Sequence, residues 1–241
     1  MSGKKVIVLE TPDRVAERAA ELFAQAATEA IGARGRFVVA LAGGSTPEKA
    51  YRVLTGRPNV EWARVYVFLG DERMVPPDDE RSNLGMARRA LLDHVPIPSA
   101  NVFAVPTDRP AAAAARQYQR SIADTVGDPP RFDLILLGLG DDGHTASLFP
   151  GKAALEEQTA WVVASPPGVL PPPVDRVTLT FPVLNAARRV AFLVTGSKKA
   201  EVVKDVFAGR DYPAARVRPT DGELTWLLDA DAAAKLDQSR S

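Results

Sequence analysis

The stretch Phe37-Val-Val-Ala-Leu-Ala-Gly-Gly-Ser-Thr-Pro-Glu-Lys-Ala-Tyr-Arg-Val-Leu54 decides the fold. Its first five residues are all apolar, which is typical of a strand that is buried on both faces. Two glycines then allow a tight turn, and residues 47–54 follow with the apolar spacing of an amphipathic helix. A fully apolar strand that leads into such a helix is the repeating unit of a parallel α/β fold.

The same unit recurs along the chain. Apolar, β-branched runs lie at 6–9, 65–69, 132–137, 161–163, 177–180 and 190–195, and helical patterns lie at 12–31, 83–92, 111–126 and 198–207. This alternation predicts one α/β domain over residues 1–241, with an open, mostly parallel, Rossmann-like sheet covered by helices on both faces. A short helix is expected at 229–236, and the proline-rich segment 166–173 is expected to be a stiff surface loop.

Composition excludes several classes of protein. Lys plus Arg and Asp plus Glu both number 30 in the 241 residues, and this balance argues against a nucleic-acid binder. The absence of cysteine excludes disulfides, thiolate metal sites and a cysteine nucleophile. No signal peptide and no apolar stretch of membrane-spanning length is present, so a cytoplasmic protein without a membrane partner is expected.

Ligands of parallel α/β sheets bind beyond the carboxyl ends of the strands, so the loops that follow strands are the candidates for a site. The turn of Gly43, Gly44, Ser45 and Thr46 opens a helix, whose free backbone N–H groups favour phosphate. Ser45 and Glu48 also have the spacing of a capping box, so a capped turn without a ligand is an equally good interpretation.

Gly70-Asp-Glu-Arg73 ends the strand at 65–69. Two acids and an arginine at a strand end suggest a functional site, but such a run is more often a solvated charged turn. Thr195-Gly-Ser-Lys-Lys199 again places a glycine before a helix, so Lys198 and Lys199 are candidates to meet a phosphate. Arg176, which precedes the run at 177–180, is a further candidate cation.

Gly138-Leu-Gly-Asp-Asp-Gly143 fits the GxGxxG fingerprint of dinucleotide sites. Pro150-Gly151 interrupts the helix that such a site requires, and no acid follows the next apolar run. The same segment is similar in spacing to a phosphate-binding P-loop, but His144 occupies the position of the P-loop's phosphate-binding lysine. Nucleotide binding is therefore not predicted.

His144 lies in a glycine loop two residues after Asp142, at the end of a buried strand. A carboxylate can fix the tautomer of such a histidine, and a neutral imidazole is a common general base near pH 7. His94, the other histidine, is better interpreted as the cap of a helix end. Two histidines fifty residues apart without cysteine make a poor metal set, so no metal is expected.

In this order the motifs resemble the 6-phosphogluconolactonase family, from near the N-terminus to about Val206. The resemblance rests on Leu41-Ala-Gly-Gly-Ser-Thr-Pro, Gly70-Asp-Glu-Arg, Ser82-Asn, Gly138-x-Gly-x-Asp-Gly-His-Thr-Ala-Ser-Leu-Phe-Pro and Thr195-Gly-x-x-Lys-Ala. It implies the Rossmann-like fold shared with glucosamine-6-phosphate deaminases and ribose-5-phosphate isomerases. It also implies hydrolysis of a small phosphorylated sugar lactone, 6-phosphogluconolactone, in the pentose phosphate pathway. Lactone hydrolysis needs no cofactor, and a monomer is expected.

By motif position the resemblance implies that His144 is the general base, that Asp142 orients it, and that Arg73 lies near the lactone carbonyl. The residues implied to hold the 6-phosphate are Gly43, Gly44, Ser45, Thr46, Arg176 and Lys199. Arg176 rests on a looser match than the others, and Lys198 stays open as an alternative to Lys199.

Two other functions remain in view. A glucosamine-6-phosphate deaminase-type isomerase would also carry Asp-Gly-His, but that family adds a glutamate five residues after the histidine, where this chain has Phe149. A non-catalytic sugar-phosphate sensor of this fold would carry a helix-turn-helix arm before the first strand, which here begins by Val6, and would not need the His–Asp pair.

Overall fold

The computed structural model describes residues 4–57, 59–167 and 173–236. Its centre is a six-stranded sheet in the order β1-β9-β8-β5-β2-β3, and every neighbouring pair of strands is parallel. The strands are β1 (Lys4–Leu9), β2 (Phe37–Leu41), β3 (Val65–Leu69), β5 (Leu134–Leu137), β8 (Arg189–Val194) and β9 (Glu223–Asp229).

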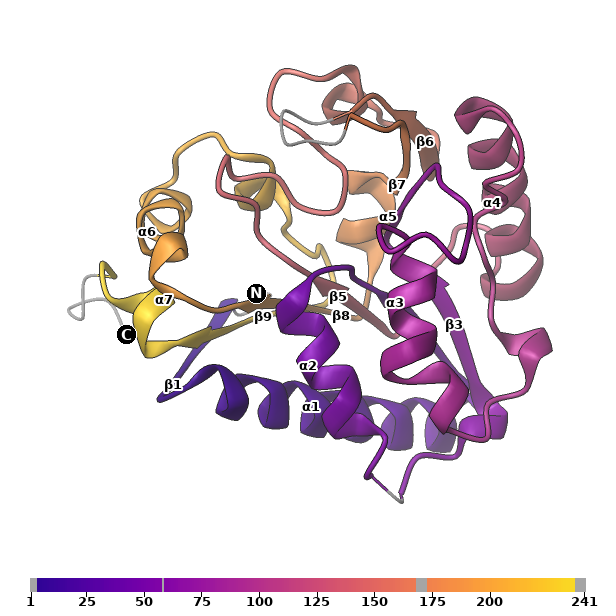
Figure 1. The fold of residues 1–241 in the computed structure, drawn as a ribbon, viewed down its shortest axis with the longest axis horizontal. Helices are drawn as coiled ribbons and strands as arrows, with labels where there is room; N and C mark the ends of the chain where they lie inside the picture. Colours follow the sequence, from indigo (N-terminus) through magenta and orange to yellow (C-terminus); the bar gives the residue numbers. More distant parts are fainter. Residues whose placement is uncertain (1–3, 58, 168–172, 237–241) are drawn as a thin grey trace.

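Helices cover both faces of this sheet (Figure 1). One face carries α1 (Pro12–Arg34), α2 (Ser45–Leu54) and α3 (Asn83–Ala90), and the other carries α4 (Ala111–Val126), α5 (Phe181–Ala186) and α6 (Ala200–Phe207). The side chains of β2 alternate between the two layers: Val39 and Leu41 pack with the first set of helices, and Val38 and Ala40 with the second. The predicted fold class is confirmed.

Three further strands form a small antiparallel sheet, β4-β7-β6. They are β4 (Asp71–Arg73), β7 (Arg176–Leu179) and β6 (Val162–Ser165). The apolar runs at 161–163 and 177–180 were expected among the parallel strands, but they lie here, because an apolar run does not reveal the direction or the sheet of its strand. Asp71–Arg73, expected to be a solvated turn, is a strand that pairs with β7.

Other boundaries also differ from the predictions. β9, which the apolar pattern did not reveal, lies between β1 and β8, and the expected helix at 229–236 shortens to α7 (Ala230–Ala233) behind it. The helical pattern at 198–207 divides into a 3-10 turn and α6. The other 3-10 turns are Trp62–Arg64, Leu92–His94, Ser99–Asn101, Ala153–Glu156 and Pro213–Arg216, beside Ser197–Lys199. Of the expected loop at 166–173, residues 168–172 lie outside the described part of the chain.

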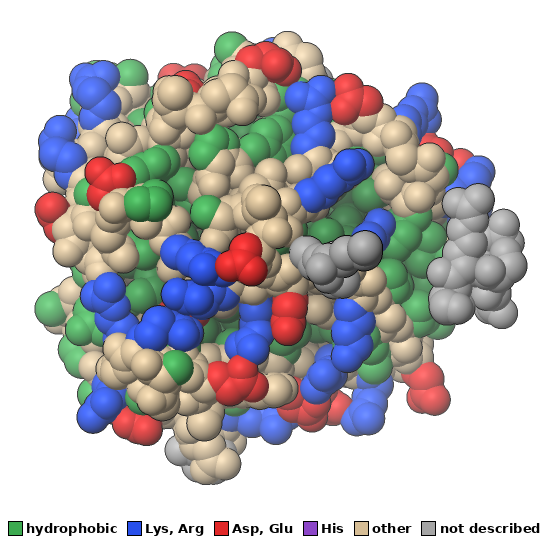
Figure 2. All heavy atoms as spheres, turned by 180° about the vertical axis from the view of Figure 1, so that it is seen from behind, with side chains coloured by type: hydrophobic (Ala, Val, Ile, Leu, Met, Phe, Trp, Pro, Cys, Tyr) green, Lys and Arg blue, Asp and Glu red, His purple; other side chains and the backbone are tan. Residues whose placement is uncertain are grey.

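Basic and acidic side chains are interspersed on the face drawn in Figure 2, in keeping with the zero formal charge of the chain. Among the described residues no helix is both long and apolar enough to cross a membrane.

Candidate active site

A cavity of about 340 Å³ opens at the carboxyl ends of the parallel strands. Three loops contribute to its lining, and each follows a strand: residues 42–47 after β2, residues 138–146 after β5, and residues 194–199 at the end of β8. Asp71 and Arg73 of β4 line it as well. Arg176 of β7 completes the lining. These are the loops that the sequence singled out, and the parallel strands bring them to one place.

His144 is held by the carboxylate of Asp142. Its Nδ1 lies 2.5 Å from Asp142 Oδ1, the same oxygen accepts the His144 backbone N–H, and 18 % of the His144 side chain remains exposed toward the cavity. Burial opposes ionisation of Asp142, but its hydrogen bond to His144 and the charge of the imidazole outweigh this and hold the pKa of Asp142 below its ordinary value. No hydrogen bond joins Nε2 of His144 to another described residue, so this nitrogen is available to a ligand.

Glycine is required where the loop passes the imidazole. A Cβ on Gly140 would lie 2.0 Å from Nδ1 of His144, and the Gly140 N–H donates to the His144 carbonyl oxygen. Gly143 has a φ of 79°, and a Cβ there would meet the ring of Tyr212. Phe149 packs its ring 4.6 Å from that of His144, centroid to centroid. Gly140 and Phe149 thus restrict the position of the imidazole.

Ala146 carries backbone strain at the cavity wall, because its φ of 48° is unusual for a residue with a Cβ. Hydrogen bonds on both sides hold it there. Thr145 Oγ1 donates to the carbonyl of Gly138, and the Ser147 N–H donates to Thr178 Oγ1. Ser147 Oγ also donates to Asp71 at 2.5 Å, which links the histidine loop to β4.

The glycine turn after β2 leads directly into α2. Gly44, with a φ of 107°, is the residue before the helix, and Ser45 is its first residue, so the predicted capping box is wrong. No side chain caps this end, and the first residues of α2, Ser45 and Thr46, line the cavity wall, so the free backbone N–H groups of the helix start lie at the cavity. Tyr51 fixes the turn from beneath: its hydroxyl accepts from the Ala42 N–H and donates to the Ala42 carbonyl.

Glu72 fastens β4 to α3. Its buried carboxylate accepts from the backbone N–H groups of Arg73, Asn83 and Leu84 and from the hydroxyl of Ser82. The Asn83 side chain in turn donates to the carbonyl and carboxylate of Asp71. A Cβ on Gly43 would lie 2.0 Å from Asn83 Oδ1, so the glycine turn after β2 packs directly against the side chain of this asparagine.

Two arginines stand side by side at the cavity, because Arg73 and Arg176 are register partners of β4 and β7. Arg73 donates from Nη1 to the carbonyl of Arg81. Arg176 Nη1 lies 3.9 Å from Asp71 Oδ2, and its guanidinium lies over the ring of Phe149. Burial lowers the pKa of Arg176, and the Asp71 carboxylate opposes that shift.

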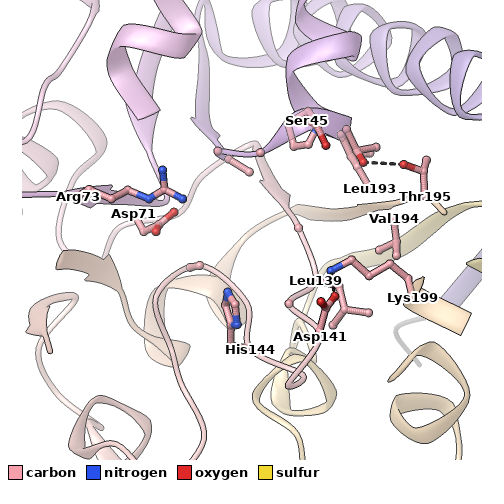
Figure 3. Close-up of a pocket in the computed structure, with 18 of the residues that line it drawn as sticks. Ser45, Asp71, Arg73, Leu139, Asp141, His144, Leu193, Val194, Thr195 and Lys199 are labelled. Carbon is pink, nitrogen blue, oxygen red and sulfur yellow. Dashed lines mark hydrogen bonds and ion pairs between the residues drawn. The ribbon is translucent and has the colours of Figure 1, made fainter. Parts of the chain in front are cut away.

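Lys199, and not Lys198, lines the cavity. Its Nζ lies 2.5 Å from Asp141 Oδ1. Figure 3 shows Arg73 and Asp71 on one side of the cavity and Lys199 with Thr195 on the other, while His144 lies below them. Thr195 also shares a hydrogen bond of 2.8 Å with Thr46, which joins the β8 loop to the start of α2.

The sequence did not reveal several residues that position this site. Asp229, at the end of β9, is buried, accepts the Gly196 N–H and caps α7 through the Ala232 N–H. An aspartate before a short alanine run is a helix-start signal that could have marked it. The hydroxyl of Tyr118 accepts from the N–H of Leu69, the last residue of β3, and donates to its carbonyl, as that of Tyr51 does at Ala42. No sequence pattern around Tyr118 predicts this contact.

His94 lies outside the cavity, and its Nε2 is 3.0 Å from the carbonyl oxygen of Arg89, in agreement with the predicted role as a helix-end cap. Among the described residues no group of three or more His, Asp or Glu side chains is arranged to hold a metal ion.

Fold and site together define an α/β enzyme that acts on a small anionic substrate: a cavity at the strand ends combines a His–Asp pair with an uncapped helix start and several cations. The family model for glucosamine-6-phosphate isomerases/6-phosphogluconolactonase matches residues 10–226, and the chain belongs to that family.

Full-length relatives agree with this assignment. The chain is 40% identical to the 6-phosphogluconolactonase of Nostoc sp., over 97% of this chain and 98% of the relative. It is 41% identical to the rat 6-phosphogluconolactonase, over 96% and 93%. The solved structure of 6-phosphogluconolactonase from Trypanosoma brucei superposes with a TM-score of 0.87 at 32% identity, over 98% of this chain and 100% of that chain.

The raised pKa of Glu72 predicts an unusual pH dependence of stability. Burial raises its pKa above the ordinary value of 4.5, although three backbone N–H groups stabilise the carboxylate. The folded state therefore holds the proton more tightly than the unfolded state, and this contribution is complete below pH 4.5 and declines as pH rises through the folded pKa. We expect the free energy of unfolding of wild type to fall relative to Glu72→Gln as pH rises over that interval.

Urea unfolding of both proteins at a series of pH values measures this difference. An unchanged denaturant slope would show that both unfold to the same extent. A difference in the free energy of unfolding between wild type and Glu72→Gln that stays constant, or that moves in favour of wild type with rising pH, would contradict the prediction.

Proposed function

We propose that this protein hydrolyses 6-phosphogluconolactone to 6-phosphogluconate, with His144 as the general base. The observation that carries the proposal is the position of His144, backed by Asp142, in the same cavity as an uncapped helix start and Lys199. The 6-phosphogluconolactonases among its relatives support the substrate.

The reaction follows from the geometry around His144. With Nδ1 committed to Asp142, Nε2 takes a proton from water as the water oxygen attacks the lactone carbonyl carbon. The carbonyl oxygen gains negative charge, and the guanidinium of Arg73 stabilises it. When the ester bond breaks, the imidazolium returns its proton to the leaving ring oxygen. The products are a hydroxyl and a carboxylic acid on the opened chain; the acid then releases its proton to solvent and becomes the carboxylate, and neutral histidine is regenerated.

Asp142 matters because it stays ionised. Its lowered pKa keeps a negative charge next to Nδ1, and this charge stabilises the imidazolium that forms during the attack. It also fixes the tautomer in which Nδ1 carries the proton and Nε2 accepts one.

The phosphate end of the substrate belongs at the opposite side of the cavity. Backbone N–H groups of Gly44, Ser45 and Thr46, the hydroxyls of Ser45 and Thr46, and Lys199 provide the donors that favour an anion. Gly43 lets the backbone approach closely, and Arg176 adds positive charge to the same cavity. Binding a phosphate remote from the carbonyl supplies energy that positions the ring for attack.

A monomer as the working unit remains a prediction. Action in the oxidative pentose phosphate pathway and a cytoplasmic location remain predictions that follow from the proposed substrate and from the sequence.

Phe149 weighs against the isomerase alternative. Its buried ring stands against His144 and beneath Arg176, in the position where the deaminase-type relay would need a carboxylate. Ammonia release from glucosamine 6-phosphate would favour that alternative. The ordered His–Asp pair weighs against a sensor that only binds, and a turnover assay run beside a binding titration separates the two.

His144→Ala should leave the fold intact and slow lactone hydrolysis by roughly a hundredfold or more, because the water loses its base. The rate is measured with fresh lactone, and spontaneous hydrolysis in a parallel reaction without enzyme is subtracted. His94→Ala is the matched control and should retain the wild-type rate, since His94 lies outside the cavity. A near-wild-type rate for His144→Ala would refute the assignment of the base.

A pair of glycine variants tests whether the position of the imidazole matters. Gly140→Ala should slow hydrolysis by at least about tenfold, because its Cβ would displace the His144 ring. At Gly32, which lies in α1 and outside the cavity, an added Cβ meets open space, so Gly32→Ala should have little effect. Both are measured in the same assay, with thermal unfolding as the check on folding. Equal rates for the two variants would show that the loop does not constrain the base.

A further inference from the structure

A second cavity, of about 360 Å³, lies apart from the active site and shares no lining residue with it. It is formed by the start of β1, the end of α6, the segment 214–219 and β9. Its walls are mainly apolar and include Phe207, Val217, Leu224 and Trp226. Its volume falls in the range of small-molecule sites in proteins.

Two cations line this cavity without an acidic partner. The Nζ of Lys4 lies 3.4 Å from the centroid of the Phe207 ring and 5.8 Å from that of Trp226. Arg218 donates from Nε only to the carbonyl of Ala215. Neither side chain forms an ion pair with a carboxylate of the described residues, whereas nearby Lys204 and Lys235 both pair with Glu201.

The positive charge of this cavity is unfavourable in free energy without a counterion. Burial lowers the pKa of Lys4, and the positive charge of Arg218 lowers it further. The two cations repel each other, and an anion between them would relieve that repulsion.

Trp226, in the wall of this cavity, has a buried N–H without a partner in the described part of the chain. The residue is 1% exposed, and its Nε1 has no hydrogen-bond acceptor among the described residues. A buried N–H without a partner is uncommon and carries a cost in free energy. The aromatic framework around it is rigid, because the Trp226 ring stacks on Phe192 at 3.9 Å between centroids and meets the edge of Phe207.

We propose that this second cavity binds a small organic anion with an apolar body, such as an aromatic carboxylate or sulfonate. Lys4 and Arg218 meet its charged group, and the wall of Phe207, Val217 and Leu224 covers its apolar part. The site is independent of lactone hydrolysis, because its residues are distinct from those around His144.

Two fluorescent probes that share an apolar body test the proposal: the anion 1-anilinonaphthalene-8-sulfonate and the uncharged N-phenyl-1-naphthylamine. The variant Lys4→Gln/Arg218→Gln removes the two cations. The matched control Lys5→Gln/Arg36→Gln removes the same charge from exposed residues that do not line the cavity. Thermal unfolding of each protein confirms that it is folded.

Loss of the two cations should weaken binding of the anionic probe roughly tenfold and change binding of the neutral probe less than about twofold, while the control keeps the wild-type affinity for both. Lys4→Arg/Arg218→Lys, which retains the charges, should keep most of the affinity. Equal affinity of the anionic probe for the two Gln variants would overturn the proposal. An equal loss of affinity for the anionic and the neutral probe in Lys4→Gln/Arg218→Gln would overturn it as well.

Discussion

The parallel alignment of β2, β3, β5 and β8 is the constraint on which the rest of the structure depends. Because these strands run in the same direction, their carboxyl ends meet at one edge, and loops far apart in sequence face one cavity. A histidine at 144 and a lysine at 199 thereby reach the same small space. The sheet itself contributes little chemistry, but it decides which loops become neighbours.

Buried polar groups then fix the loops at that edge. Glu72 joins β4 to the start of α3, Asn83 extends this link beneath Gly43, and Asp229 holds the loop at Gly196. Each of these side chains is almost fully buried and hydrogen-bonded, and a buried polar group with partners adds order to a protein interior. The geometry of the cavity therefore rests on side chains that do not line it.

The sequence was sufficient for the fold class and for which loops line the cavity. Both follow from patterns that are local: an apolar run such as Phe37–Leu41, a glycine turn, and a histidine two residues after an aspartate. The predicted site residues line one cavity, apart from Asp142, which stands behind His144 as its hydrogen-bond partner.

What the sequence could not supply depends on contacts between distant segments. The pairing of β4 with β7, which turns Asp71–Arg73 from an expected surface turn into a buried strand, joins residues about a hundred positions apart. The choice of Lys199 over Lys198 depends on the direction in which each side chain leaves a 3-10 turn. Ser45 begins α2 rather than capping it, because Gly44 can adopt the left-handed backbone that the turn requires.

A crystal structure of the protein with 6-phosphogluconate bound tests the central claim most directly. The account predicts phosphate oxygens within about 2.7–3.2 Å of the backbone N–H groups at Ser45 and Thr46 and of Lys199 Nζ. It predicts the carboxylate carbon of the same molecule next to His144 Nε2 and Arg73. A product that lies outside this cavity, or that turns its phosphate toward His144, would contradict it.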